Sequence, residues 1–239
     1  MEVFTLIAII ALFSLVQSVF GVGILLFGTP TLLLLGYPYS ESLCIVLPSS
    51  LSISLAQVFS CRQLVEAKRD VYLLALPSVL ISLIIVLNFE ELWDITKIVG
   101  FFLLMVGLFR VSKKLKMFLD RIINKRPKYI YVFTGLIHGL SNMGGGPLSV
   151  LMASIHKDKI AIRTNIAFVY FWFSLIQLSV LAVFSLDSFK YYYFLFPFLS
   201  LLIFNLFNKS LMEKIDEKKF QIIITIIIIL YGLIALFKS

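Results

Sequence analysis

The stretch Leu136-Ile137-His138-Gly139-Leu140-Ser141-Asn142-Met143-Gly144-Gly145-Gly146-Pro147 is a polar, glycine-rich interruption within an apolar segment of the chain. A backbone that leaves the helix at membrane depth must be buried in protein or line a water-filled cavity, where its polar groups find partners. The half-helix after such a break directs the positive end of its dipole at the interruption, where an anion is stabilised. The interruption therefore predicts a hairpin of two half-helices around a polar site inside a membrane.

The composition of the whole chain is typical of a membrane protein. Hydrophobic residues make up 60% of its 239 residues and charged residues 14%, whereas soluble domains have about 45–50% and about 25%. The apolar residues form runs that approach the ~20 residues required to cross a bilayer. These runs are Ser42–Ser60, Val71–Asn88, Ile98–Val111, Arg163–Leu186, Phe189–Phe207 and Phe220–Phe237. We therefore expect an all-α polytopic protein of the cell inner membrane, without a separate soluble domain.

Several landmarks in the first half of the chain recur about 120 residues later, in the same order. The segment Tyr72–Pro77 has the same tyrosine-to-proline spacing as Tyr192–Pro197. The pair Gly107-Leu108 recurs in the same way as Gly232-Leu233. The shared order and offset predict a protein built from two repeats.

The distribution of lysine and arginine predicts how these repeats cross the membrane, because both residues favour the cytoplasmic ends of helices. Most of them fall on one side if Val3–Leu35 and Tyr129–Ile155 each form a hairpin that returns to the face it entered. Three full crossings then follow each hairpin, and this odd number inverts the second repeat relative to the first. We therefore predict two inverted repeats, each a broken-helix hairpin plus three transmembrane helices, with binding at their interface. The units are residues 1–112, a cytoplasmic linker at 113–128 and residues 129–239, and the lysines left outside are Lys97, Lys190 and Lys238.

The linker between the repeats has its own pattern. From Lys113 to Lys128, basic residues alternate with Leu115, Phe118, Ile122 and Ile123. This pattern is typical of a short helix that lies on an anionic cytoplasmic membrane surface. The net charge of +8 is thus explained by orientation and contact with the lipid bilayer, and it does not require nucleic acid as a partner.

Motifs in both halves resemble one family of membrane proteins. Gly21-Val22-Gly23, Pro30 and Gly36 in the first half, with Gly144–Pro147 and Arg163-Thr164-Asn165 in the second, resemble the TauE/SafE sulfite-exporter-like permeases. The resemblance spans the whole chain as two homologous halves. It implies a permease whose partner is a small sulfur-containing anion such as sulfite, a sulfonate or sulfoacetate.

The first half departs from the family pattern. It has Gly23-Ile24-Leu25 where the family has a glycine triplet, so we expect the first hairpin to contribute less backbone to the site. It also has Pro48-Ser49-Ser50 where the family has a Thr-Ser pair. Because Val3–Phe20 is long enough to cross the membrane by itself, this hairpin is either re-entrant or two tilted, nearly complete helices.

The residues of the interruption suit an anion. Pro147 fits the first turn of a helix, where the missing N–H costs nothing. Gly144, Gly145 and Gly146 allow backbone N–H groups to turn towards a ligand and form an anion nest. Ser141 and Asn142 can donate further hydrogen bonds to sulfite or sulfonate oxygens. The alternative interpretation is that these small residues only permit close helix packing.

His138 is the one ionisable side chain well inside an apolar segment. Such residues usually face a cavity or a partner group, and histidine can carry a proton near neutral pH. A protonated His138 would favour the bound anion and couple transport to the proton gradient. The alternative is a neutral histidine that is hydrogen-bonded to a neighbouring carbonyl.

Polar residues on the helices after each hairpin complete the candidate substrate-binding set. By repeat symmetry, Ser49-Ser50 and Thr164-Asn165 should flank one cavity. The alternative for such hydroxyls is a hydrogen bond to their own helix backbone. Arg163 is either an attractor for anions at the gate or a topological anchor at a cytoplasmic helix end. The candidates outside the interruption are Gly21, Gly23, Ser49, Ser50, Gln57, Thr164, Asn165 and Gln177.

Two other functional classes are weaker. An intramembrane enzyme with His138 as its base would need a partner carboxylate or metal-ligand spacing, but Glu41, Asp94 and Asp187 all lie in expected loops. A helical scaffold for a membrane complex would not need polar breaks within its apolar segments. We therefore expect a permease with no catalytic residue, no metal ligand and no cofactor.

Overall fold

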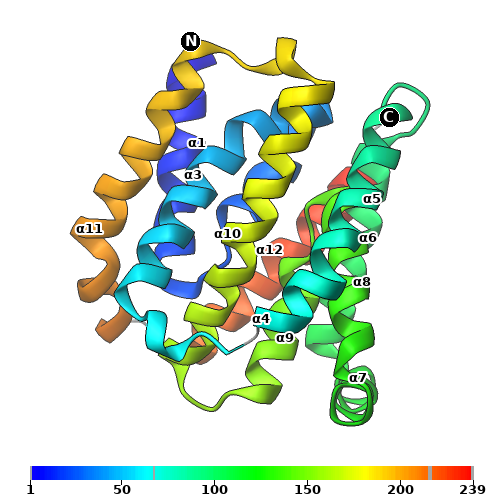
Figure 1. The fold of residues 1–239 in the computed structure, drawn as a ribbon, viewed down its shortest axis with the longest axis vertical. Helices are drawn as coiled ribbons and strands as arrows, with labels where there is room; N and C mark the ends of the chain where they lie inside the picture. Colours follow the sequence, from blue (N-terminus) through cyan, green and yellow to red (C-terminus); the bar gives the residue numbers. More distant parts are fainter. Residues whose placement is uncertain (1, 67, 215–216, 238–239) are drawn as a thin grey trace.

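The computed structural model describes residues 2–66, 68–214 and 217–237, and all the regular structure in them is helical (Figure 1). The expected all-α class is therefore confirmed. The first half of the chain forms α1 (Glu2–Phe20), η1 (Ile24–Gly28), α2 (Thr29–Leu34), α3 (Tyr39–Ser60), η2 (Arg62–Leu64), α4 (Lys68–Asp70), η3 (Val71–Ala75), α5 (Leu76–Asn88) and α6 (Ile95–Val111). Lys238, counted above as an outer lysine, lies outside the described residues.

The second half has a similar order of elements. It consists of α7 (Lys113–Lys125), α8 (Pro127–Ser141), α9 (Gly145–Ile155), α10 (Lys159–Phe184), η4 (Leu186–Ser188), η5 (Tyr191–Leu195), α11 (Phe196–Lys214) and α12 (Glu217–Phe237). In each half, a pair of helices joined by a tight turn precedes three further helical segments. The apolar runs expected from the sequence fall on these later segments.

Among the described residues, four helical segments are long and apolar enough to cross a membrane. They are Val3–Phe20, Tyr39–Ser60, Val71–Asn88 and Lys159–Phe184. Large apolar side chains also cover the outer surface, as at Phe4 (77% exposed), Val183 (77%) and Phe198 (71%). Soluble proteins rarely expose apolar surface on this scale, whereas the hydrocarbon of a bilayer covers it. The chain is thus a multi-pass helical membrane protein.

Each half begins with a helix that reverses direction at a left-handed residue. After α1, Gly21 has φ 73°, and after α8, Asn142 has φ 63°. Glycine and asparagine adopt this conformation at the least cost, which explains why they end these helices. In the first hairpin α1 has 19 residues, whereas its return arm consists of η1 with 5 residues and α2 with 6. The first hairpin therefore combines one helix of crossing length with a short return arm.

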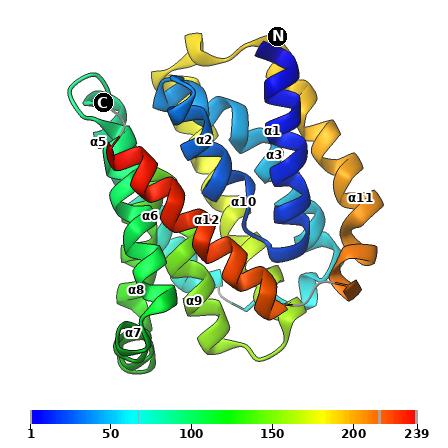
Figure 2. The same cartoon turned by 180° about the vertical axis from the view of Figure 1, so that it is seen from behind.

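The two hairpins open towards opposite ends of the molecule. In Figure 1 the start of α1 lies at the top and α7 lies at the bottom. Figure 2 shows α1 running down from the top and α2 returning upwards, while α8 rises from α7 and α9 returns downwards. The turns of both hairpins consequently lie inside the molecule.

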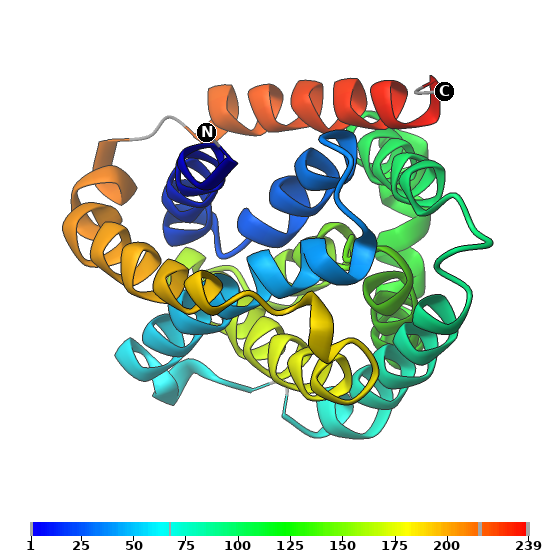
Figure 3. The same ribbon diagram turned by 90° about the horizontal axis from the view of Figure 1, so that it is seen from above.

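The strongest helix contacts join the two halves. They pair α6 with α12, α3 with α10, α5 with α8, and α11 with both α1 and α3. Figure 3 shows α12 lying along one side of the molecule, with its C-terminal end beside α6. The repeated glycines mark the α6–α12 contact. A Cβ on Gly107 would lie 2.6 Å from Ile229 Cγ1, and a Cβ on Gly232 would lie 2.8 Å from Leu104 Cδ2. Glycine is therefore needed at both positions because the two helices approach so closely.

The linker helix α7 has two apolar faces. Ile123, on its inner side, is 4% exposed, whereas Met117 and Phe118 are 62% and 55% exposed. The Ser112 hydroxyl accepts a hydrogen bond from the Leu115 amide at 3.3 Å and so caps the start of the helix. Exposed apolar side chains on a helix rich in lysine and arginine are typical of a helix at a membrane interface.

Candidate functional site

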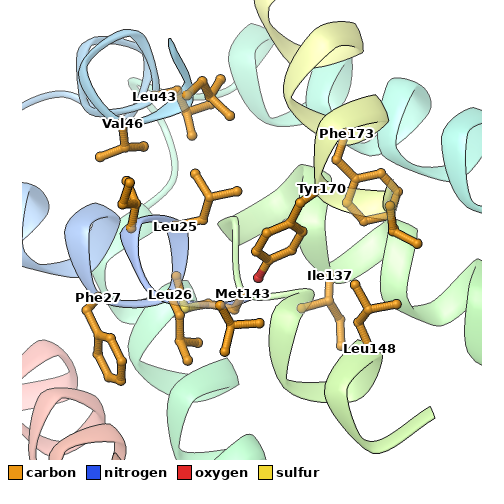
Figure 4. Packing of buried hydrophobic residues seen from close by; sticks show 14 of the residues in the cluster. Leu25, Leu26, Phe27, Leu43, Val46, Ile137, Met143, Leu148, Tyr170 and Phe173 are labelled. Atoms are coloured by element: carbon orange, nitrogen blue, oxygen red, sulfur yellow. The ribbon is translucent and has the colours of Figure 1, made fainter. Parts of the chain in front are cut away.

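The turns of the two hairpins meet in the interior. Asn142 Nδ2 donates a hydrogen bond to Thr29 Oγ1 at 2.8 Å, and both residues are fully buried. Figure 4 shows Leu26 of the first hairpin beside Met143 of the second. Asn142 thus serves at least one structural purpose, because its amide joins the two halves of the chain.

The N-terminal end of α9 is bordered by polar groups on two sides. A Cβ on Gly144 would lie 3.0 Å from His138 Nδ1, and a Cβ on Gly145 would overlap the Tyr170 hydroxyl. A Cβ on Gly146 would instead overlap the side chain of Val106 on α6. Pro147 lies in the first turn of α9, as expected. The interpretation as close helix packing therefore applies to Gly146. Gly144 and Gly145 approach polar side chains, as the interpretation as an anion site requires.

His138 is fully buried between aromatic rings of α10. Its ring centroid lies 4.5 Å from that of Phe173 and 5.6 Å from that of Tyr170. Nε2 is 3.1 Å from Gln177 Oε1. With the Gln177 amide in this orientation the hydrogen is on Nε2, because a carbonyl oxygen only accepts. Nδ1 then presents a lone pair, and it has no hydrogen-bond partner among the described residues.

Further buried polar atoms without a partner lie on the same elements. Buried polar groups are nearly always hydrogen-bonded, so a concentration of exceptions requires an explanation such as a ligand or ordered water. On α10, Tyr170, Ser174 and Gln177 follow the i, i+4, i+7 spacing that places side chains on one helix face. Within the part of the chain that the structure describes, the unpartnered atoms of α8, α10 and the turn between α8 and α9 include Thr134 Oγ1, His138 Nδ1, Asn142 Oδ1, Tyr170 Oη, Ser174 Oγ and Gln177 Nε2.

The equivalent region of the first hairpin is mostly paired. Gln17 Nε2 donates to Ser50 Oγ at 3.0 Å and to Ser54 Oγ at 3.3 Å, while its Oε1 accepts from the Ile24 amide at 3.2 Å. Gln57 Nε2 donates to the Gln17 carbonyl at 3.1 Å. On α3, the atoms without a partner among the described residues are Gln57 Oε1 and the hydroxyls of Ser42 and Ser49. These polar groups therefore mainly hold the first hairpin together.

Gly21 and Gly23 also serve packing. A Cβ on Gly21 would lie 3.1 Å from Arg163 Cγ, and a Cβ on Gly23 would lie 2.5 Å from the Gln17 amide nitrogen. Arg163 is only 8% exposed, and its Nη1 donates to the Ser18 carbonyl at 3.1 Å. The arginine thus binds the C-terminal turn of α1, where the helix dipole favours a cation.

The pairs Ser49-Ser50 and Thr164-Asn165 lie at different levels of the α3–α10 contact. Asn165 Nδ2 donates to the Leu64 carbonyl at 2.8 Å, and its Oδ1 accepts from the Glu66 amide at 2.9 Å. Asn165 therefore holds the connection that follows α3, whereas Ser50 contacts Gln17 in mid-helix. Thr164 is buried beside it, at 1% exposed. Ser141 likewise bonds its own helix, donating to the Ile137 carbonyl at 2.7 Å.

Tyr170 and Ser174 belong to this cluster of unpartnered polar atoms, and the sequence reasoning missed both. The signal that could have found them is the repeat itself. Ser50, Ser54 and Gln57 on α3 recur about 120 residues later as Tyr170, Ser174 and Gln177 on α10, the same offset as that of the Tyr–Pro landmarks. With this offset, the second-half counterpart of Ser50 is Tyr170, and not Thr164.

A multi-pass helical protein whose broken helices meet around buried polar groups has the architecture of a membrane transporter. The comparison with protein families supports this class. The chain matches the family described as Sulfite exporter TauE/SafE over residues 6–234, and it belongs to that family. It is therefore a membrane permease of the sulfite-exporter type. No curated protein and no solved structure matches the chain.

Proposed function

We propose that the protein transports a small sulfur-containing anion, such as sulfite, sulfoacetate or another organosulfonate, across the cell inner membrane. The anion binds at the N-terminal end of α9, against His138, Tyr170 and Gln177. The observation that carries this proposal is the cluster of buried, unpartnered polar atoms beside that helix end. Sulfite and sulfonate groups offer three oxygens that accept hydrogen bonds, and thus supply what the donors in this cluster lack.

The donors of the site come from three sources. In the first turn of α9, the Gly146 N–H is bonded to the Met143 carbonyl at 3.4 Å and Pro147 has no N–H. The Gly145 N–H, which has no acceptor within its own helix, is therefore the backbone donor at this end. The Tyr170 hydroxyl lies against Gly145 and can donate to an anion oxygen, and so can Gln177 Nε2. Asn142 has a different role, because its Nδ2 is already bound to Thr29 and its free Oδ1 is an acceptor.

His138 links the anion to a proton. In the tautomer that bonds Gln177, Nδ1 presents a lone pair towards Gly144 and would repel an anion oxygen there. A proton on Nδ1 turns this lone pair into a donor. Proton and anion binding therefore favour each other reciprocally, and a protein that carries both across the membrane is a proton-coupled transporter.

Two inverted repeats, residues 1–112 and 129–239 with the cytoplasmic linker 113–128, supply the framework for this transport. The helix contacts support the repeats, because exchanging the halves converts α1–α11 into α8–α5 and maps α3–α10 and α6–α12 onto themselves. The opposite openings of the two hairpins also fit an inversion (Figure 2). With the site buried at the contact between the halves, a movement of one half against the other exposes it to each side in turn.

The test is anion flux in proteoliposomes that contain the purified protein. We expect saturable uptake of sulfite or an organosulfonate, and competition that is stronger from other sulfonates than from small carboxylates. Tyr170→Phe should weaken the uptake, whereas Tyr129→Phe, a control at an exposed residue of α8, should not. Absence of flux for every sulfur-containing anion would contradict the proposal and favour the scaffold or enzyme classes.

A further inference from the structure

A groove of about 750 Å³ lies between the middle of α3, the C-terminal half of α10 and the start of α11. Its lining includes Pro48, Ser52, Leu55, Leu178, Ala182 and Phe194. Ser52 is the only one of these with a polar side chain, and its hydroxyl already donates to the Ser49 carbonyl at 2.8 Å. The groove therefore suits an apolar occupant and offers nothing to the transported anion.

The equivalent position in the other half is filled by the protein. Tyr72, which precedes α5, packs edge-on against Phe168 and Trp172 of α10, with ring centroids 6.0 Å and 5.2 Å away. Aromatic contacts of this kind stabilise a packed surface. The residues about 120 positions apart from Phe168 and Trp172 are Pro48 and Ser52 on α3.

This exchange of two large aromatic residues for two small ones leaves the groove open. Tyr192, the counterpart of Tyr72, packs instead against its neighbours Tyr193 and Phe196, with centroids 4.8 Å and 6.4 Å away. The groove thus coincides with a specific difference in residue size between α3 and α10 at equivalent positions.

The groove runs parallel to the membrane-crossing helices. It extends along α3 from Pro48 to Leu55, which is roughly 10 Å at a rise of 1.5 Å per residue. On the other side it follows α10 from Leu178 to Ala182 and continues to Leu186 of η4. One end reaches the connection between α10 and α11, at the top of Figure 1. Lys190 and the 87% exposed Tyr191 lie in this connection, and such residues typically mark the membrane–water interface.

We propose that this groove binds one acyl chain of a membrane phospholipid, whose headgroup lies beside Lys190 and Tyr191. An acyl chain has the required apolar character, enters the hydrocarbon layer at the interface and runs along the bilayer normal as the groove does. Val183 and Phe198, the sequence neighbours of the lining residues Ala182 and Pro197, are 77% and 71% exposed and already require hydrocarbon around them. This inference is independent of the anion that the protein transports.

Filling the groove tests the proposal. Ser52→Trp introduces the residue that the second half has at the equivalent position, Trp172, and should block the groove. As a control, Leu202→Trp adds the same side chain at a 56% exposed position of α11. In native mass spectrometry from mild detergent, the wild type and Leu202→Trp should retain a phospholipid that Ser52→Trp loses. Added phospholipid should raise the Tm of the first two proteins more than that of Ser52→Trp, because a ligand stabilises only the state that binds it.

Two outcomes would overturn the proposal. Equal lipid retention and equal Tm shifts in folded Ser52→Trp and wild type would show that no lipid binds in the groove. A wild-type dimer that Ser52→Trp converts to a monomer would show that a second copy of the chain occupies it. If Ser52→Trp does not fold, Ala182→Leu fills the groove from the α10 side with a smaller change, and the same measurements apply.

Discussion

The two hairpins share a backbone design but differ in how their buried polar groups are paired. In the first, the Gln17 amide has a partner for its nitrogen on α3 and for its oxygen on the backbone of Ile24. In the second, His138 occupies the matching position near the end of α8, yet its Nδ1 has no partner among the described residues. The first hairpin pairs most of the polar groups in its region, whereas several in the second have no partner among the described residues.

This difference assigns unequal tasks to two similar structures. A closed hydrogen-bond network rigidifies the region that contains it, and the first hairpin supports the second through the Asn142–Thr29 bond. The open network around α9 is where the proposed function places the anion. The following substitutions test this division, and each has a counterpart in the other half.

The largest effect is expected from filling the turn of each hairpin. In Gly145→Leu the new side chain meets the Tyr170 hydroxyl and occupies the end of α9, so transport should fall about 100-fold or more, as expected when binding groups are displaced by an ångström. The protein should still insert and elute as a single species. In Gly23→Leu the new atoms meet the Gln17 amide and the Phe13 carbonyl at 2.5 and 2.9 Å, so the loss should be of folded protein. Normal flux through folded Gly145→Leu would remove α9 from the site.

The paired glutamines give the second contrast. Gln177→Leu removes a donor to the anion and the partner of His138, so anion KM should rise about 10- to 100-fold, since a hydrogen bond to a charged group is worth ~1.5–3 kcal/mol. Gln57→Leu leaves the Gln17 carbonyl without that donor, which should lower the free energy of unfolding by about 1–3 kcal/mol. Its KM should stay unchanged. Equal KM effects in both variants would show that the two halves share the binding task.

A hydroxyl comparison gives the third and smaller contrast. The Tyr170 hydroxyl has no partner in the described structure, whereas the Tyr39 hydroxyl donates to the Gly139 carbonyl at 3.2 Å. Tyr170→Phe should therefore weaken anion binding about tenfold and leave thermal stability as it is. Tyr39→Phe should lower Tm without changing anion affinity. A lower Tm with unchanged affinity in Tyr170→Phe would mean that its hydroxyl is structural.

The second hairpin could be predicted from the sequence because its features are local. A glycine triplet followed by Pro147 allows few backbone conformations other than a break that opens a helix. Its expected span, Tyr129–Ile155, agrees with α8 and α9 to within two residues at the start. The apolar runs also gave the helical membrane class, since length and hydropathy require no knowledge of packing.

Which residues of α10 point into the polar cluster could not be predicted from the sequence in the same way. Which face of a helix points inwards depends on its partners, and on this apolar helix Tyr170 and Ser174 have no local pattern that separates them from lipid-facing residues. The sequence favours Thr164 and Asn165 because they belong to the motif Arg163-Thr164-Asn165 and because repeat symmetry pairs them with Ser49-Ser50. Asn165 instead bonds the connection around Leu64 and Glu66, a tertiary contact to residues about 100 positions away that no local spacing reveals.

The smallest effect concerns the proton, and it tests the position where the two hairpins differ most. His138→Gln gives the second hairpin the side chain that Gln17 provides in the first, so it keeps a hydrogen bond to Gln177 but cannot take up a proton. If a proton on Nδ1 enters with the anion, lowering the pH should strengthen binding, by at most about tenfold per pH unit. The change should span the range around the ordinary histidine pKa of about 6.5, and His138→Gln should flatten the profile without abolishing transport.

Sulfite and a sulfonate must be compared in the same assay, because sulfite itself takes up a proton near neutrality whereas a sulfonate keeps its single charge. One profile for both anions, lost in His138→Gln, assigns the proton to the histidine. A profile that is seen only with sulfite and survives in His138→Gln assigns it to the substrate, and then His138 differs from Gln17 in shape alone.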